Sequence, residues 1–250
     1  MKLTILSCCA LFVAVVSASA EQDPASDWQV KVTPYLWMTG LSGGVGRLPD
    51  GSPVQVDLSF RDVVEDLDLA GMVYGSVSDG LWTVYLDLTY VSSSSTEPLA
   101  GILFNETRVD SDTATFGLAI GRTIVRTDRA SVTAYAGARA WWIENAFELR
   151  GIAGRPLRES SSEFWVDPLV GIAGQYEPND KWLLTGALDV SGFGVAADSG
   201  FSALVGATYR VSDWVGVSVG WRHLEVDYSS DSTLFDIRQS GPLLGATIVF

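Results

Sequence analysis

Residues 214–222, with the sequence WVGVSVGWR, alternate apolar side chains with small or polar ones. One face of this stretch carries Val215, Val217, Val219 and Trp221. The other face carries Gly216, Ser218, Gly220 and Arg222. A period of two is that of a β-strand whose faces meet different surroundings. The stretch therefore predicts a strand with one continuous apolar face and one small, polar face.

The same alternation recurs along the chain, for instance at residues 28–38, 82–90, 164–176 and 201–209. Together these patterns predict ten strands, at residues 28–41, 67–78, 81–92, 107–122, 131–147, 162–176, 182–193, 201–211, 214–228 and 236–250. Eight strands is the alternative, because the patterns at residues 67–78 and 182–193 are weak. An even number is expected if antiparallel strands close into a bacterial membrane barrel.

The two faces and the connections favour such a barrel over a soluble protein. A soluble sandwich carries many charges on its outer face, whereas here the polar face is small and the apolar face ends in aromatic residues. Short turns are predicted at residues 79–80, 127–129, 178–180 and 212–213. Longer connections are predicted at residues 43–66, 93–106, 150–161, 196–200 and 229–233. This alternation indicates short periplasmic turns and longer extracellular loops.

The first twenty residues have the features of a secretory signal peptide. Lys2 precedes an apolar run at residues 3–16, and residues 18–20 read ASA, a small-x-small cleavage pattern. We predict cleavage after Ala20, which leaves residues 21–250 as one barrel domain. Both cysteines, Cys8 and Cys9, lie in this segment, so the mature chain is expected to have no thiol chemistry.

Composition argues against several classes of protein. Removal of residues 1–20 leaves 15 basic against 30 acidic residues, which disfavours nucleic acid as a partner. No later stretch is apolar over the roughly 20 residues that a membrane-spanning helix needs. An exported chain rich in aromatic residues, without such a helix, is expected to be an all-β secreted or outer-membrane protein.

The carboxyl end supports insertion into the outer membrane. Phe250, Ile248, Ala246 and Leu244 share one face of the last predicted strand. A terminal strand of this kind, ending in Phe250, resembles the assembly signal of outer-membrane barrels. The resemblance implies the barrel-assembly machinery as a partner.

A wider resemblance rests on short segments spread over the chain. They are residues 33–37 (TPYLW), 40–43 (GLSG), 57–60 (DLSF), 67–69 (LDL), 220–222 (GWR), 226–228 (VDY) and 241–245 (GPLLG). In this order they resemble a family of small proteobacterial outer-membrane β-barrel proteins, OmpA- or OmpW-like. Such proteins usually have Gly-Tyr-Arg at residues 220–222, so Trp221 is a departure. The resemblance implies fold and location but no established activity, and no functional residue is carried over.

Six charged residues are expected to point into the barrel if the apolar faces look outward. They are Lys31, Asp87, Arg139, Asp167, Asp189 and Arg222. One interpretation is a salt-bridged polar core, because opposite charges offset each other's desolvation. The other is a narrow pore or a small-solute pocket lined by these groups, whose balanced charge predicts weak ion selectivity. Among the tryptophans, Trp37, Trp141 and Trp165 also face inward by parity, where they fill the lumen or line a pocket. Most of the others lie near predicted strand ends, where interfacial aromatic girdles are expected.

An enzymatic alternative rests on His223, the single histidine. Glu225 and Asp227 are close in sequence, followed by Ser229 and Ser230, near the predicted outer rim. Parity, however, places His223 on the lipid face, so we expect no catalytic residues.

The first long connection offers a capping box and a group of acids. Ser59 followed by Asp62 predicts a short helix. Its acids are Asp57, Asp62, Glu65, Asp66 and Asp68; a divalent cation is one interpretation, but no calcium-loop spacing is present and a solvated acidic loop is favoured. We expect no metal and no cofactor.

The sequence thus predicts a cell outer-membrane β-barrel, either structural or a narrow passive channel for a small solute. Its expected surroundings are outer-membrane lipid and lipopolysaccharide. The alternatives are a lipid-modifying or proteolytic outer-membrane enzyme using His223, and a secreted soluble β-sandwich binding protein.

Overall fold

The computed structural model describes residues 28–47, 53–98, 104–151, 157–230 and 234–250. The predicted signal peptide, its cleavage after Ala20 and both cysteines lie outside these residues. Within the described part of the chain, no helix is long and apolar enough to cross a membrane.

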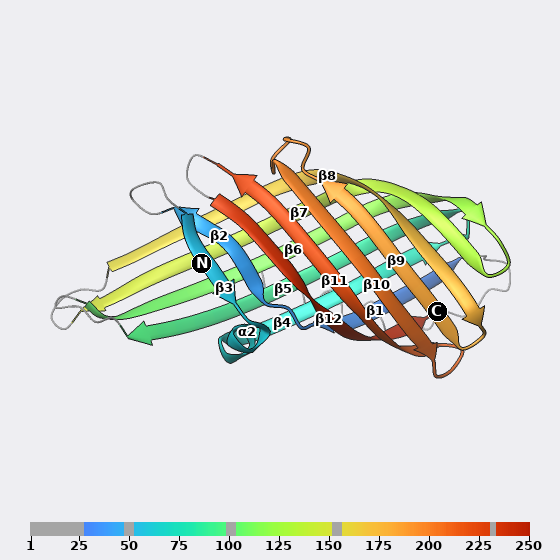
Figure 1. Ribbon diagram of the computed structural model, residues 1–250, viewed down its shortest axis with the longest axis horizontal. Helices are drawn as coiled ribbons and strands as arrows, with labels where there is room; N and C mark the ends of the chain where they lie inside the picture. The colour runs from blue at the N-terminus through green and yellow to red at the C-terminus, as the bar shows by residue number, and fades with distance from the viewer. Residues whose placement is uncertain (1–27, 48–52, 99–103, 152–156, 231–233) are drawn as a thin grey trace.

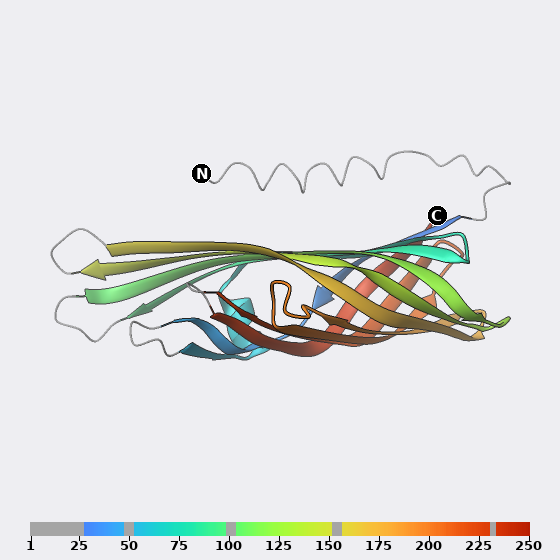
Figure 2. The ribbon, with the colours of Figure 1, turned by 90° about the horizontal axis from the view of Figure 1, so that it is seen from above.

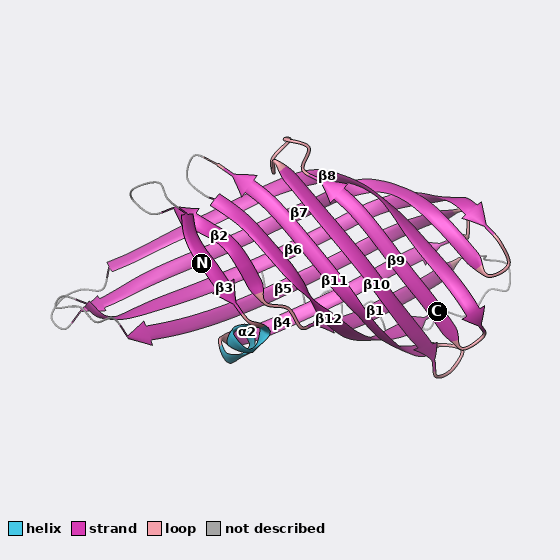
Figure 3. Ribbon diagram, in the orientation of Figure 1, coloured by secondary structure: helices cyan, strands magenta, loops and turns pink. Residues whose placement is uncertain are grey.

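Ten antiparallel strands form a closed barrel (Figures 1 and 3). They are β1 (Gln29–Trp37), β4 (Leu67–Ser78), β5 (Trp82–Pro98), β6 (Phe104–Arg126), β7 (Ala130–Gly151), β8 (Leu157–Asn179), β9 (Trp182–Ser191), β10 (Ser199–Arg210), β11 (Val215–Ser229) and β12 (Leu234–Val249). Each strand pairs with the next one along the barrel, and β1 pairs with β12, with Lys31 opposite Val249 and Trp37 opposite Leu243. The prediction of ten strands is confirmed, and the closed barrel rules out the two-sheet soluble sandwich.

The predicted long connections after residues 93 and 150 are largely wrong. Strands β5 to β8 continue through much of both segments and project beyond the other strands as a long, four-stranded extension (Figures 1 and 2). The periodicity was misleading here because residues 92–95 are all serine. A strand with water on its outer side needs no apolar alternation, so the sequence signal is lost while the backbone ladder continues.

The first connection contains more structure than the predicted helix alone. Strands β2 (Leu41–Arg47) and β3 (Pro53–Leu58) form a hairpin, and β2 also pairs with residues 235–238 of β12. Helix α2 (Phe60–Glu65) follows, and its capping box is confirmed: the backbone N–H of Ser59 donates to Asp62 Oδ2 at 2.8 Å, and the Asp62 N–H donates to the Ser59 hydroxyl at 3.4 Å. The hairpin thus continues the sheet next to β12, and α2 lies at the end of β3, beside β4 (Figure 1).

Two belts of exposed aromatic residues surround the barrel. The belt near the short turns contains Trp28, Trp82, Tyr176, Trp182, Tyr209, Trp214 and Phe250. The belt toward the long strands contains Trp142, Phe164, Phe201 and Trp221. On β8 the belts are separated by the distance from Phe164 to Tyr176, which is about 40 Å along a strand and about 28 Å across a membrane at a tilt of about 45°. The band between them, which includes Ile172, Leu188 and Val217, is exposed and apolar, as a lipid-facing surface must be.

Beyond the second belt, the apolar side chains change from the outer face of the strands to the inner face. On β11, Val217 and Val219 face outward below Trp221, whereas above it the outward residues are His223 and Glu225. The inward residues of the upper part are apolar and buried: Leu224, Val226 and Tyr228. We call the part of the barrel between the short turns and the second belt its lower half, and the part beyond the second belt its upper half. The outer surface is apolar in the lower half, whereas the inner surface is apolar in the upper half.

Candidate functional site in the barrel lumen

The six predicted inward charges lie inside the barrel wall. Five of them, Lys31, Asp87, Arg139, Asp189 and Arg222, line one cavity in the lower half of the lumen. The sixth, Asp167, is fully buried behind this cavity, next to the upper half. Strands β1, β5, β7, β8, β9 and β11 each contribute one of these residues, which only the closure of the barrel brings together.

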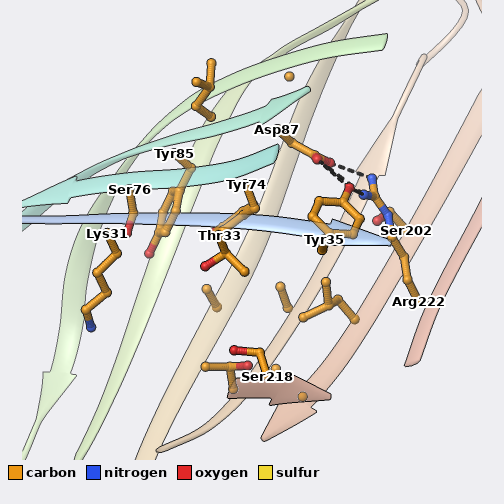
Figure 4. Close-up of a pocket in the computed structure, with 18 of the residues that line it drawn as sticks. Lys31, Thr33, Tyr35, Tyr74, Ser76, Tyr85, Asp87, Ser202, Ser218 and Arg222 are labelled. Atoms are coloured by element: carbon orange, nitrogen blue, oxygen red, sulfur yellow. Dashed lines mark hydrogen bonds and ion pairs between the residues drawn. The ribbon is translucent and has the colours of Figure 1, made fainter. Parts of the chain in front are cut away.

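Asp87 and Arg222 form a buried ion pair across the lumen, from β5 to β11. Arg222 Nη2 lies 2.5 Å from Asp87 Oδ2, and the Tyr35 hydroxyl donates to Asp87 Oδ1 at 3.0 Å (Figure 4). Arg222 Nη1 also donates to the Tyr35 oxygen. Because the arginine side chain is only 4 % exposed, this bridge offsets the desolvation of both charges and ties opposite walls together.

Arg139 and Asp189 form a second buried pair. Arg139 Nη2 lies 3.1 Å from Asp189 Oδ1, with side-chain exposures of 7 % and 8 %. The Tyr135 hydroxyl donates to the other carboxylate oxygen at 3.4 Å. Of the five charges that line the cavity, four are thus paired with one another.

Asp167 has a different environment. Its side chain accepts hydrogen bonds at 2.8 Å from the Trp165 indole N–H and from the backbone N–H of Ala197. Ala197 belongs to the β9–β10 connection, residues 192–198, so Asp167 holds this connection against the barrel interior. Asp167 also lies directly opposite Arg139 in the β7–β8 ladder.

The upper half of the lumen is filled by an apolar cluster, which we name the aromatic plug. Its buried members are Trp37, Met72, Trp141, Ile143, Trp165, Ala197, Leu224, Val226, Tyr228, Phe235 and Ile237. Trp165 stacks between Trp141, at 5.6 Å between ring centroids, and Tyr228, at 3.9 Å. The Phe235 ring meets both tryptophans edge-on, at 6.0 and 5.9 Å. Such contacts close the lumen with packed rings, as in a protein core.

The plug and the ion pairs are in direct contact. The Arg222 guanidinium lies 5.0 Å from the centre of the Trp37 ring, a cation–π contact. The Trp37 indole N–H donates to the carbonyl of Gly241 at 3.3 Å, which fixes the ring against β12. A side-chain layer of charge therefore lies beneath a layer of rings.

The β9–β10 connection covers part of the plug, and its backbone needs glycine. Gly192 and Gly194 have φ angles of 88° and 68°, and Phe193 has 55°. A Cβ at Gly192 would lie 2.8 Å from the Ala197 carbonyl oxygen. These left-handed conformations turn the chain so that Ala197, with no exposed surface, enters the plug.

Below the ion pairs, the lumen is hollow and opens toward the short turns. The inner cavity has a volume of about 210 Å³, and Tyr135 lies in its wall. Tyr74 and Tyr85 line the same wall (Figure 4). It continues into a wider mouth of about 490 Å³. Lys31, Ser76, Tyr85 and Gln175 line both spaces, so the two form one pocket with an opening at the turn end.

The residues proposed for other chemistry lie elsewhere. His223 is on the outer face, with Nε2 2.9 Å from Glu225 Oε1, and Arg238 donates to the same carboxylate oxygen. The Phe201 ring lies 6.0 Å from the imidazole. Among the described residues, no three His, Cys, Asp or Glu side chains are placed to hold a metal ion, so the acids of the first connection gain no support as a cation site.

The sequence reasoning missed most of the plug and the tyrosine wall. Trp37, Trp141 and Trp165 were placed inward by parity, and they fill the lumen. Leu224, Phe235 and Ile237 were not recognised, although parity counted along β11 from Arg222 and along β12 from Thr247 turns them inward. The signal was obscured because apolar residues were expected to mark the outer face throughout.

No protein-family model matches the sequence, and no curated protein matches it. Among solved structures, the chain is similar to the outer-membrane protease OmpT from Escherichia coli, with 13 % identity, 90 % of this chain and 98 % of that chain covered, and a TM-score of 0.54. A second is the translocator domain of the autotransporter NalP from Neisseria meningitidis, with 13 % identity, 97 % of this chain and 95 % of that chain covered, and a TM-score of 0.43. A third is the toluene transporter TodX from Pseudomonas putida, with 11 % identity, 89 % of this chain and 88 % of that chain covered, and a TM-score of 0.37. At this identity the likeness to OmpT concerns the fold alone: the chain has the fold of an outer-membrane β-barrel protein.

Proposed function

We propose that this chain is a non-conducting integral barrel of the bacterial outer membrane, with a lumen closed on one side and a pocket open on the other. The single observation that carries the proposal is the aromatic plug. Trp165, in its centre, is 4 % exposed and stacks on rings from β7 and β11. A passive channel needs a continuous polar path, and a layer of packed rings provides none.

The two buried ion pairs support the structural interpretation of the lumen charges. Asp87 and Arg222 form a pair across the lumen, and Arg139 and Asp189 form a pair along the wall, from β7 to β9. Because the two charges of each ion pair neutralise each other, these side chains attract mobile ions only weakly. We therefore favour the structural role of these residues over that of pore lining.

The location and orientation follow from the belts and turns. We infer that the short turns, the mouth of the pocket and Phe250 face the periplasm, because short turns mark that side of outer-membrane barrels. The four-stranded extension and the β2–β3 hairpin then face the outside, where lipopolysaccharide is the surrounding lipid. Phe250, 48 % exposed at the carboxyl end of β12, is proposed to engage the barrel-assembly machinery after export.

We further propose that the chain is not an enzyme. His223 hydrogen-bonds to a carboxylate on the outer face, away from the lumen pocket, and among the described residues its imidazole hydrogen-bonds to no hydroxyl nucleophile. The test is His223→Ala. Unchanged lipid composition and peptide cleavage in cells that carry this variant would agree with the proposal, and loss of either activity would contradict it.

The first experiment combines membrane fractionation with gel mobility of boiled and unboiled samples. We expect the protein in the outer membrane and a shift in mobility on boiling, since a closed barrel resists detergent until it is heated. A soluble protein without a shift would contradict the membrane location.

Conductance in planar lipid bilayers tests closure. The wild-type protein should give no steady current steps. The double variant Trp165→Ala with Arg222→Ala removes one member from each closing layer and should conduct more than wild type. Trp142→Ala is the matched control, because Trp142 is the lipid-facing neighbour of Trp141 and is 41 % exposed. Steady wild-type conductance would overturn the proposal.

A further inference from the structure

The pocket below the plug contains one charge that the lumen does not neutralise. Lys31 projects from β1 at the boundary between the inner cavity and the mouth (Figure 4). It makes no hydrogen bond or ion pair with the part of the chain that the structure describes. Two charged side chains that act on it electrostatically, Glu177 and Arg210, are paired with each other, with Arg210 Nη2 2.6 Å from Glu177 Oε1.

The charges lining the cavity therefore sum to one positive charge. Asp87 cancels Arg222, and Asp189 cancels Arg139. Asp167 is sealed behind them, with no exposed surface, and does not line the cavity. Asp79 and Arg126 add one charge of each sign at the mouth, so Lys31 is left as the surplus cation of the whole pocket. Its ammonium group has three donors, which suits one anionic group at the mouth.

The wall above Lys31 is aromatic. The Tyr74 and Tyr85 rings lie 6.4 Å apart, and the Tyr85 and Tyr135 rings 5.4 Å apart, so three rings form a continuous surface. Tyr74 is 36 % exposed although it faces inward, because its free surface meets the cavity. Its hydroxyl makes no hydrogen bond with the described residues. Leucines, among them Leu169, Leu183 and Leu204, complete the apolar wall.

We propose that this pocket binds a small organic carboxylate with an apolar or aromatic body, which enters from the turn end. The carboxylate binds the Lys31 ammonium group at the mouth. The body lies against the tyrosine wall in the inner cavity, below the Asp87–Arg222 pair. A pocket with mostly apolar walls and few placed polar groups is the usual form of a small-molecule site. The inference rests on the proposed closure of the lumen, because an open pore would offer the ligand a path rather than a site.

The test is equilibrium dialysis of radiolabelled phenylacetate against the full barrel in lipid nanodiscs, with empty nanodiscs as the blank. Wild type should show saturable binding. Lys31→Met keeps the aliphatic stem but removes the charge, and it should weaken binding about tenfold to a hundredfold, as expected when one charge-assisted hydrogen bond is lost. Lys31→Arg should bind within about threefold of wild type, because it keeps a cationic donor.

The matched control is Lys181→Met. Lys181 is the only other lysine among the described residues, lies exposed in the β8–β9 turn and lines neither space of the pocket. This variant should bind phenylacetate as wild type does. Phenylacetamide, the neutral analogue of the probe, should compete poorly with it.

A second variant tests the inner cavity without touching the charge. Ala187 lines the cavity from β9, and Ala187→Phe should fill it and abolish binding while the boiled and unboiled gel mobilities stay as in wild type. Absence of saturable binding to wild type, equal binding by Lys31→Met, or equal competition by phenylacetamide would each overturn the inference. Conductance of the same purified protein distinguishes the two proposals. A closed barrel that fails to bind phenylacetate contradicts only the proposal of a carboxylate site, whereas a steady current contradicts the proposed closure of the lumen.

Discussion

The lower and upper halves of the barrel are built from the same strands with opposite patterns. Between the aromatic belts, the outward residues of β11 are valines and the inward residue at its upper end is Arg222. Above the second belt, Glu225 and Asp227 look outward while Val226 and Tyr228 are buried inside. One continuous strand thus changes from a membrane pattern to that of a soluble protein.

The difference shows that the solvent, and not the fold, decides which face of a strand is apolar. Where hydrocarbon surrounds the barrel, apolar side chains face out and the lumen takes polar groups. Where water surrounds it, the upper strands bury their apolar residues inward, as any soluble sheet does. The pocket lies where the barrel is surrounded by hydrocarbon, and the aromatic plug lies where it is surrounded by water.

The largest expected effect comes from removing the centre of the plug. Trp165→Ala should lower the free energy of unfolding by about 3–5 kcal/mol, because a large aromatic side chain leaves a cavity among stacked rings. The midpoint of urea unfolding in lipid vesicles, followed by gel mobility, measures the loss. Trp142→Ala, on the outer side of the neighbouring strand β7, should cost clearly less; equal losses would contradict the contrast between inside and outside.

Breaking an ion pair below the plug should be nearly as costly. Arg222→Met leaves Asp87 as an uncompensated charge in the lumen, and we expect a loss of about 3–5 kcal/mol by the same measurement. The double variant Asp87→Leu with Arg222→Met should recover much of that stability, because it leaves no buried charge. If the double variant were no more stable than Arg222→Met, the loss would come from packing against Trp37 instead.

A charge placed on an exposed apolar position distinguishes the two halves directly. Leu188 faces outward in the lower half, whereas Phe147 lies in the four-stranded extension, on the same face of β7 as Trp141; the two side chains are 48 % and 49 % exposed. Leu188→Arg should destabilise the barrel by about 2–4 kcal/mol, because it places a cation in hydrocarbon. Phe147→Arg should change stability by less than about 0.5 kcal/mol, because it meets water. Equal effects would mean that the lipid boundary lies elsewhere than at the second belt.

The smallest effect concerns pH and the exposed helix α2. The hydrogen bonds that the Ser59 side chain and backbone donate to Asp62 lower the pKa of its carboxyl group. A lowered folded-state pKa means that the stabilisation is present above the unfolded pKa and is lost as pH falls through the folded one. We expect amide exchange in α2 to speed up at acidic pH in wild type, and Asp62→Asn to remove this dependence. An identical acid response in both proteins would remove Asp62 as the cause.

The strand positions could be read from the sequence because alternation is local. All ten barrel strands were anticipated, as was the Ser59 capping box, since each depends on residues a few positions apart. The weak pattern at residues 67–78 proved to be β4, held in place by pairing with β1 and β5. The extension of β5 to β8 was missed, because serine on both sides of a strand gives no hydrophobic period.

The sequence by itself determined which residues turn inward: parity alone places Lys31, Asp87, Arg139, Asp167, Asp189 and Arg222 on the lumen side. Only the tertiary structure decided which of them meet. Asp87 and Arg222 are 135 positions apart and come together because β1 closes on β12 and the strands tilt, which sets their relative height in the lumen. The same register leaves Lys31 without an ion-pair partner among the described residues, beside a hollow space, and stacks Trp165 on Tyr228. These outcomes depend on the shear of the barrel, which is the stagger in hydrogen-bond register summed over all its strands. No local pattern of residues encodes this sum.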